Sequence, residues 1–143
     1  MIGRATAVAL VAAGVVLTAT ALVLPWYSTV YAGGVEVVVR AWGTEVVNKP
    51  GDWPAGDLSP WYGVPVVVTV ALLVAGVWVR QAALAGSAAQ VGAVAVIAAL
   101  LVSERGHAVE QQGDFALGFG LVFLVAGTLV ALVGAVAVQR EAA

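Results

Sequence analysis

Long apolar runs separated by short polar segments dominate this chain of 143 residues. Four runs contain no Asp, Glu, Lys, Arg or His, and they cover approximately residues 5–24, 61–79, 82–102 and 115–138. A transmembrane helix needs about 20 mostly apolar residues, because each residue adds about 1.5 Å and the hydrocarbon core is about 30 Å thick. The pattern therefore predicts an all-α membrane protein, a left-handed four-helix transmembrane bundle that forms one integral membrane domain over residues 1–143.

The first run also has features of a secretory signal peptide. Arg4 provides a basic start, and Ala19-Thr20-Ala21 matches the small-x-small pattern of a cleavage site. Apolar residues nevertheless continue past this point through Leu24. We therefore expect a retained helix in place of a cleaved signal.

Four spans would place both termini on one side of the membrane. Arg4, Arg80 and Arg140 lie at span ends on that side, whereas Arg40 and Lys49 lie deep in a longer loop. Basic residues close to span ends set the orientation, and acidic residues count little. The excess of arginine over lysine, with abundant alanine, valine and glycine, is typical of GC-rich bacterial genomes. We expect a multi-pass protein of a bacterial cytoplasmic membrane with both termini in the cytoplasm.

Residues 25–60 form the longest polar segment, and we expect them outside the cytoplasmic membrane. β-Branched and aromatic residues on both sides of Gly33-Gly34 predict a β-hairpin over residues 27–42, because glycine adopts the positive φ of a tight turn. In its second strand, Glu36 and Arg40 should share one face. An isolated hairpin is marginal in water. It should therefore rest on helix ends, on a third strand near Val46-Val47, or on a neighbouring protein. Residues 103–114 are expected to form a second outer loop.

Aromatic residues gather where the spans are expected to meet the outer water. Amphipathic rings favour this level of a bilayer. The predicted outer belt consists of Trp26, Tyr27, Trp61, Tyr62 and Phe115. Trp42 and Trp53 lie in the outer loop and are the candidates for contact with a partner protein.

Small residues recur along the fourth run, and one amide lies inside the third. The seam in the fourth run comprises Gly120, Gly127, Ala131 and Gly134. Such residues let helix backbones approach closely, either within this bundle or against a helix of another protein. Gln90 is costly in lipid, so its amide should find a partner across a helix interface.

The remaining chemistry argues against an enzyme. Glu104 and His107 have the Glu-x-x-His spacing of di-metal bundles, but such sites need it twice with further glutamates, and His107 is the single histidine. Cysteine is absent, and a net charge of −2 does not suit nucleic acid. General acid–base catalysis and proton transport both need positioned titratable groups. We expect no catalytic residue, metal site or cofactor.

The residues Leu24-Pro25-Trp26-Tyr27 end the first run and precede a polar outer loop. In this feature the chain resembles the tryptophan-associated transmembrane proteins of actinobacteria. The layout, with Ala41-Trp42-Gly43 after a strand-rich stretch, also resembles the claudin-like four-helix plan, although the paired cysteines of that plan are absent. These resemblances imply a four-helix membrane fold and supply no reaction.

The leading functional hypothesis is an accessory or structural subunit of a larger membrane complex, respiratory or of the cell envelope, with membrane lipids and other membrane subunits as partners. A second hypothesis is a self-associating carrier or channel for a neutral or apolar molecule, with a polar path near Gln90 and Thr128. A third is a lipid- or pigment-binding module, which predicts a groove beside the glycine stripe of the fourth helix.

Overall fold

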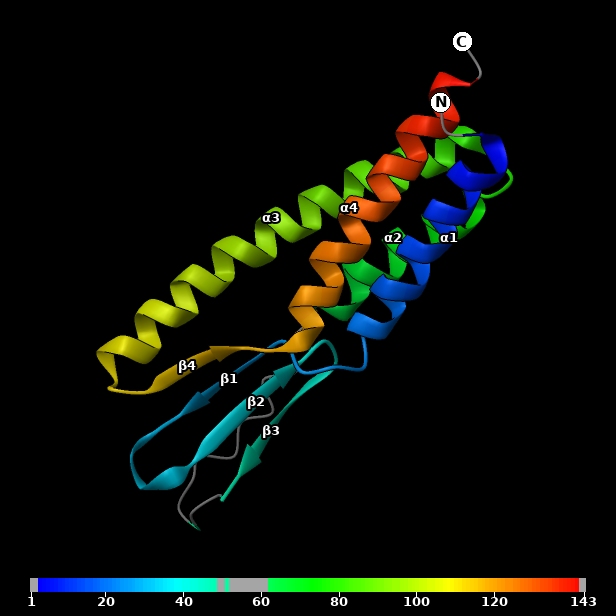
Figure 1. Cartoon of the computed structure of the whole chain (residues 1–143). Coiled ribbons are helices and arrows are strands. Elements are labelled where there is room, and N and C mark those ends of the chain that lie inside the picture. Colours follow the sequence, from blue (N-terminus) through cyan, green and yellow to red (C-terminus); the bar gives the residue numbers. More distant parts are fainter. Residues whose placement is uncertain (1–2, 49–50, 52–61, 142–143) are drawn as a thin grey trace.

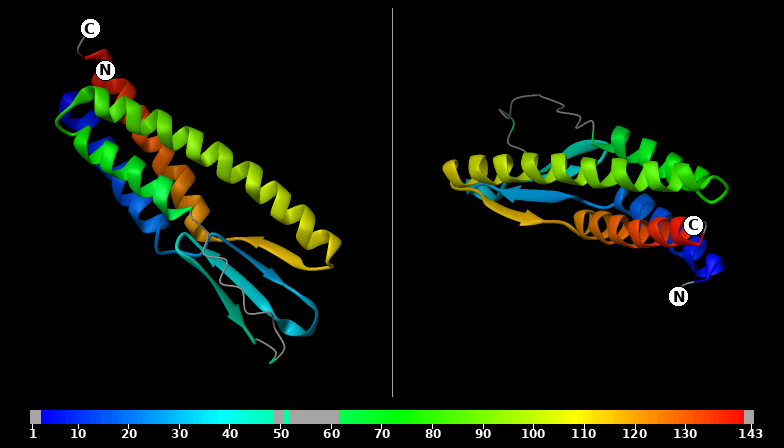
Figure 2. Two further views of the ribbon diagram at one scale, coloured as in Figure 1. Left: turned by 180° about the vertical axis from the view of Figure 1, so that it is seen from behind. Right: turned by 90° about the horizontal axis from the view of Figure 1, so that it is seen from above.

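The computed structural model describes residues 3–48, 51 and 62–141, and Figure 1 shows how their helices and strands are arranged. The helices of the described chain are α1 Arg4–Ala21, α2 Gly63–Ala75, α3 Arg80–Glu110 and α4 Phe119–Arg140. The same described residues form the strands β1 Tyr27–Val30, β2 Glu36–Arg40, β3 Gly43–Val47 and β4 Asp114–Leu117, and a 3-10 turn, η1 Ala32–Gly34. The helices form a bundle, and the sheet extends from the end of it that lies opposite the two chain termini (Figures 1 and 2).

Three of these helices, α1, α3 and α4, are long and apolar enough to cross a membrane. The helix α2 has 13 residues, which amounts to about 20 Å at about 1.5 Å per residue. The second predicted span, residues 61–79, was therefore too long. Its last residues form a tight turn into α3, in which the N–H of Val79 donates to the carbonyl of Ala75 at 2.9 Å. A methyl group at Gly76 would lie 2.5 Å from the Cα of Ala83, so glycine permits this turn.

The helix α3 continues well past the predicted end of the third span. It has 31 residues and ends at Glu110, where a loop over residues 103–114 was expected. Alanine, glutamate and arginine in this stretch all have high helix propensity. The charged residues among them end the apolar run but do not end the helix. The chain then reverses at Gln112, which has a φ of 56°. The predicted outer loop is thereby reduced to a short turn.

The strand β4 occupies the predicted start of the fourth span. Phe115 lies opposite Thr29 and Leu117 opposite Tyr27 in an antiparallel ladder with β1. The fourth helix consequently begins at Phe119 and not at residue 115. The local sequence does not distinguish β4 from the start of α4, because both are apolar. The strand is defined by its pairing with β1, which lies far earlier in the chain.

The four strands form one antiparallel sheet in the order β3-β2-β1-β4. The predicted hairpin over residues 27–42 is confirmed, with Tyr27 opposite Val39. Gly33 and Gly34 have φ values of 84° and 77°, as the tight turn required. The third strand expected near Val46-Val47 is present as β3.

Candidate functional site

The small-residue seam of α4 packs against α1 of the same chain. A methyl group at Gly127 would lie 2.6 Å from Oγ1 of Thr18, and one at Gly134 would lie 2.8 Å from the backbone nitrogen of Val11. Ala131 lies between these two glycines and is fully buried. The two backbones can approach this closely because the residues between them carry almost no side chain. Of the two sequence-based alternatives, packing within the bundle is therefore the one observed along this stretch.

The seam ends at Gly120, where α4 meets the segment that follows α1. A methyl group at Gly120 would lie 2.5 Å from Cδ1 of Trp26 and 2.8 Å from the carbonyl oxygen of Leu24. In contrast, Gly92 of α3 has no heavy atom within 4 Å of the position its Cβ would take. Close approach is thus a property of particular glycines and not of glycine-rich helices in general.

Gln90 finds its partner across a helix interface, as its burial in an apolar run predicted. Its Nε2 donates to Oγ1 of Thr18 on α1 at 2.7 Å, and that hydroxyl donates to the carbonyl of Gly14 at 2.8 Å. Both side chains are fully buried. Among the described atoms, Oε1 of Gln90 and Oγ of Ser87 have no hydrogen-bond partner. The contact joins α3 to the α1–α4 pair.

Two other buried hydroxyls of the bundle donate to carbonyls of their own helices. Thr69 donates to the carbonyl of Val66, and Thr128 donates to the carbonyl of Leu124, each at 2.7 Å. Within residues 3–48 and 62–141, no Asp, Glu, Lys, Arg or His is buried. The described interior therefore holds no charged side chain of the kind that ion-coupled and proton transporters place there.

Trp26 is a core residue and does not form part of an exposed belt. Its ring has 0% of its surface exposed and stacks on Tyr62 with 5.5 Å between ring centroids. Its Nε1 donates to the carbonyl of Ala21, the last residue of α1, at 2.7 Å. Pro25 cannot continue α1, so the chain turns and places Trp26 beneath the helix end. The sequence-based assignment to the outer belt is corrected for this residue.

Tyr27 also lies inside, between the sheet and α3. Only 8% of the residue is exposed, and its ring lies 5.4 Å from that of Phe115, centroid to centroid. Burial raises the pKa of the Tyr27 hydroxyl far above its ordinary value, and the nearby Tyr62 and Glu104 raise it further. The hydroxyl therefore stays protonated and neutral. Tyr27 and Phe115 join the sheet to the helices, where the sequence suggested headgroup contacts. We call this cluster of Trp26, Tyr27, Tyr62 and Phe115 the junction.

Trp42, in contrast, is half-exposed where the sheet meets the bundle. A methyl group at Gly63, the first residue of α2, would lie 2.7 Å from the Trp42 ring, and 53% of Trp42 remains exposed. Trp42, predicted as a contact for a partner protein, therefore keeps about half of its surface accessible. Trp53 and Trp61 lie outside the described residues.

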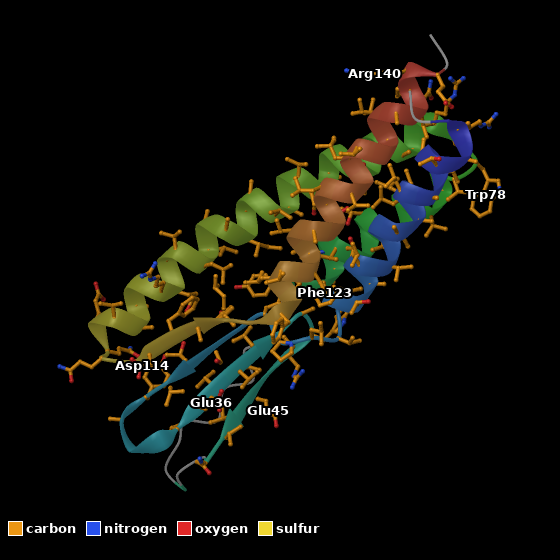
Figure 3. The ribbon with its side chains drawn as sticks, viewed as in Figure 1. Glu36, Glu45, Trp78, Asp114, Phe123 and Arg140 are labelled. Carbon is orange, nitrogen blue, oxygen red and sulfur yellow. The ribbon has the colours of Figure 1, made fainter. Side chains whose placement is uncertain are left out.

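One face of the sheet packs on the helices, and the other carries most of its charge. Side chains that lie directly opposite one another in a sheet point to the same face. The register therefore shows which residues belong to the face that carries the charge, which we call the outer sheet face. Its members are Ser28, Val30, Glu36, Val38, Arg40, Glu45, Val47, Asp114 and Ala116. Figure 3 labels three of its carboxylates, Glu36, Glu45 and Asp114. The guanidinium of Arg40 lies 3.6 Å from the Glu45 carboxylate, so the face keeps a net negative charge.

A groove of about 390 Å³ lies between α3 and β4. Its lining is apolar except for one guanidinium, and it consists of Ala98, Leu101, Val102, Arg105, Phe115 and Leu117. Sequence reasoning did not find this groove, because residues 115–117 were assigned to a helix. We call it the outer groove. The glycine stripe, beside which a groove was predicted, is instead covered by α1.

Comparison with models of known protein families and with curated proteins finds no match to this sequence.

Proposed function

We propose that this chain is a non-catalytic integral membrane protein that serves as an accessory subunit of a larger membrane complex, in the respiratory chain or the cell envelope. The proposed location is the cytoplasmic membrane of a bacterium, with both termini in the cytoplasm. Its proposed partners are membrane lipids and another membrane subunit. No nucleic acid or cofactor is part of the proposal.

The outward surfaces of the helices support a membrane location. On α4, Val122, Leu129 and Val133 are 60%, 59% and 52% exposed. Apolar surface of this extent would be a liability in water, whereas lipid tails accept it without cost. Together with the three helices of sufficient length, this surface favours insertion over a soluble fold.

The described interior supports a non-catalytic role. Its buried polar groups are threonine and serine hydroxyls and one amide, and none of these changes charge near neutral pH. The bundle core is closed by side chains such as Val11 and Leu73, which are almost completely buried. This packing gives no support to a channel through a single copy of the chain.

The outer sheet face is the observation that carries the accessory role. It places valines between carboxylates, with Val30 opposite both Glu36 and Asp114. The junction fixes this sheet to the bundle, so the face has a defined direction relative to the helices. A rigid, negatively charged and partly apolar surface suits an outer segment of a partner that carries basic and apolar side chains.

Purification of the tagged full chain from its native membrane in a mild detergent, followed by native mass measurement, tests this proposal. We expect a mass that exceeds one copy by that of at least one other protein. A clean monomer without associated protein would contradict the accessory role.

A pair of charge reversals locates the contact. Glu36→Lys places a cation on the outer sheet face, and Glu110→Lys makes the same change at the end of α3, at a residue that is not part of the sheet. We expect Glu36→Lys to release the partner, because like charges repel across an interface, while Glu110→Lys retains it. Equal retention by both variants would remove the outer sheet face as the contact.

The outer groove favours a lipid-binding role as a second candidate. Its apolar lining with Arg105 at one point fits an acyl chain that ends in an anionic group. Ala98→Trp would fill the groove, and labelling of its peptides by a photoreactive fatty acid should then fall. Unchanged labelling would exclude this site.

A further inference from the structure

In contrast to the apolar outer groove, a polar cavity lies at the end of the bundle that carries both chain termini. It has a volume of about 240 Å³ and is lined by Arg4, Arg80, Val138 and Glu141. Arg4 is the first residue of α1 and Arg80 is the first residue of α3. Two helices that are distant in sequence therefore bring two guanidinium groups to one cavity. We call it the terminal cavity.

The charges of the terminal cavity do not balance. Among the described residues that line it, two guanidinium groups and the single Glu141 carboxylate leave one positive charge. Across residues 3–48 and 62–141, the ion pair that forms is Arg40–Glu45, at the other end of the molecule. Arg4 and Arg80 also oppose their own helices, because a cation is favourable at a helix C-terminus and unfavourable at the N-terminus. Their positions are thus explained by something other than helix stability.

The surroundings of the terminal cavity match the boundary of a bilayer. Trp78, in the turn that precedes Arg80, is 76% exposed, and Figure 3 shows it at the same end of the molecule as Arg140. Exposed tryptophan is typical of the headgroup level. Val138 adds an apolar wall to the cavity. A ligand here would meet cations and apolar surface side by side.

We propose that the terminal cavity binds the phosphate of an anionic phospholipid. The Arg4 and Arg80 guanidinium groups donate N–H bonds to the phosphodiester oxygens, a geometry that suits their planar fork. One phosphodiester carries a single negative charge and neutralises the cavity. A hydroxyl-bearing headgroup, such as that of phosphatidylglycerol, can also donate to the Glu141 carboxylate, and Val138 contacts the start of an acyl chain. This site is independent of the proposed contact at the outer sheet face.

Lipid retention by the full-length protein, measured by native mass spectrometry after delipidation, tests this site. Phosphatidylglycerol, phosphatidylcholine and phosphatidylethanolamine with identical acyl chains are added in turn. We expect preferential retention of one phosphatidylglycerol. Removal of one charge-assisted bond in Arg80→Gln should weaken it by about tenfold, and Arg4→Gln/Arg80→Gln by more. The matched control Arg40→Gln removes one cation at the sheet end and should leave retention unchanged.

Two further measurements test the proposal even if the glutamine variants fail to fold. Arg4→Lys/Arg80→Lys preserves both charges, and we expect a several-fold loss because an ammonium group lacks the planar fork. Millimolar inorganic phosphate should leave the bound phosphatidylglycerol in place, since free phosphate makes no contact with Val138. Equal retention by the lysine variant and the native chain, equal binding of all three lipids, or complete displacement by inorganic phosphate would each overturn the proposal. Partner retention through the outer sheet face is expected to survive every variant at Arg4 and Arg80.

Discussion

The seam between α1 and α4 and the junction between the sheet and the helices are both buried, but they are built from opposite kinds of residue. Along the seam, Gly127 and Gly134 bring backbone close to backbone. At the junction, the rings of Trp26 and Tyr62 stack and fill the space beneath the end of α1. The seam depends on the absence of side-chain atoms, and the junction depends on their presence. Added atoms should therefore damage the first region, and removed atoms should damage the second.

Removal of atoms at the junction should have the largest effect. Trp26→Ala deletes a fully buried ring, and truncation of a buried aromatic residue costs about 3–5 kcal/mol. We expect a large fall in the thermal stability of the detergent-solubilised protein, followed by circular dichroism. Trp42→Ala is the matched control, because it removes the same type of side chain from a position that is 53% exposed. Similar losses in both variants would show that the junction has no special role.

Addition of atoms along the seam comes next. Gly134→Ala places a methyl group 2.8 Å from the backbone nitrogen of Val11, and overpacking of this kind costs about 1–3 kcal/mol. Gly92→Ala makes the same change where no atom lies within 4 Å. It should be neutral or slightly stabilising, since alanine favours a helix more than glycine does. Equal melting temperatures for the two variants would refute close packing along the seam.

The hydrogen bond beside the seam should give an effect of similar size that is not additive. Thr18→Val leaves the buried Nε2 of Gln90 without its acceptor, and an unsatisfied buried group costs about 1–3 kcal/mol. Thr18→Val/Gln90→Leu removes both partners and should recover much of that loss. A double-mutant cycle on unfolding free energies measures the coupling. Strict additivity would mean that the bond contributes nothing.

The smallest effect is a pH dependence at the junction. The pKa of Tyr27 is raised in the folded protein, whereas an unfolded tyrosine titrates near about 10. The native state then holds a proton that the unfolded state releases, so stability is constant below about pH 10 and falls above it, by at most about 1.4 kcal/mol per pH unit. Thermal melts recorded between neutral and alkaline pH test this. The stability of the Tyr27→Phe variant should fall less steeply above about pH 10 than that of the native chain. An unaltered slope would assign the decline to other groups.

The contrast between these two regions also explains which parts of the fold the sequence could predict. The helices α1 and α4 follow from local apolar runs, and Gly127, Ala131 and Gly134 mark their seam by regular spacing. The hairpin follows from Gly33-Gly34 between β-branched stretches. All of these features have local signals, and the structure contains all of them.

The junction and the outer groove depend on contacts between distant parts of the chain. The sequence of β4 is apolar and directly precedes α4, so only its ladder with β1 distinguishes it from the first turn of a helix. Trp26 has the composition of an interfacial residue, and only the hydrogen bond to Ala21 and the Tyr62 ring show that it is buried. Arg105 is placed beside the outer groove by the extension of α3, which an apolar-run analysis ends at Val102.

The strand β4 also sets an order on biosynthesis. It is the second neighbour of β1, yet it is translated after α3, whereas the other three strands are translated before α2. A nascent chain therefore displays an incomplete sheet until the ribosome has passed Leu117. A contact that needs both Asp114 and Glu36 could therefore form only on chains that have already made their first three helices.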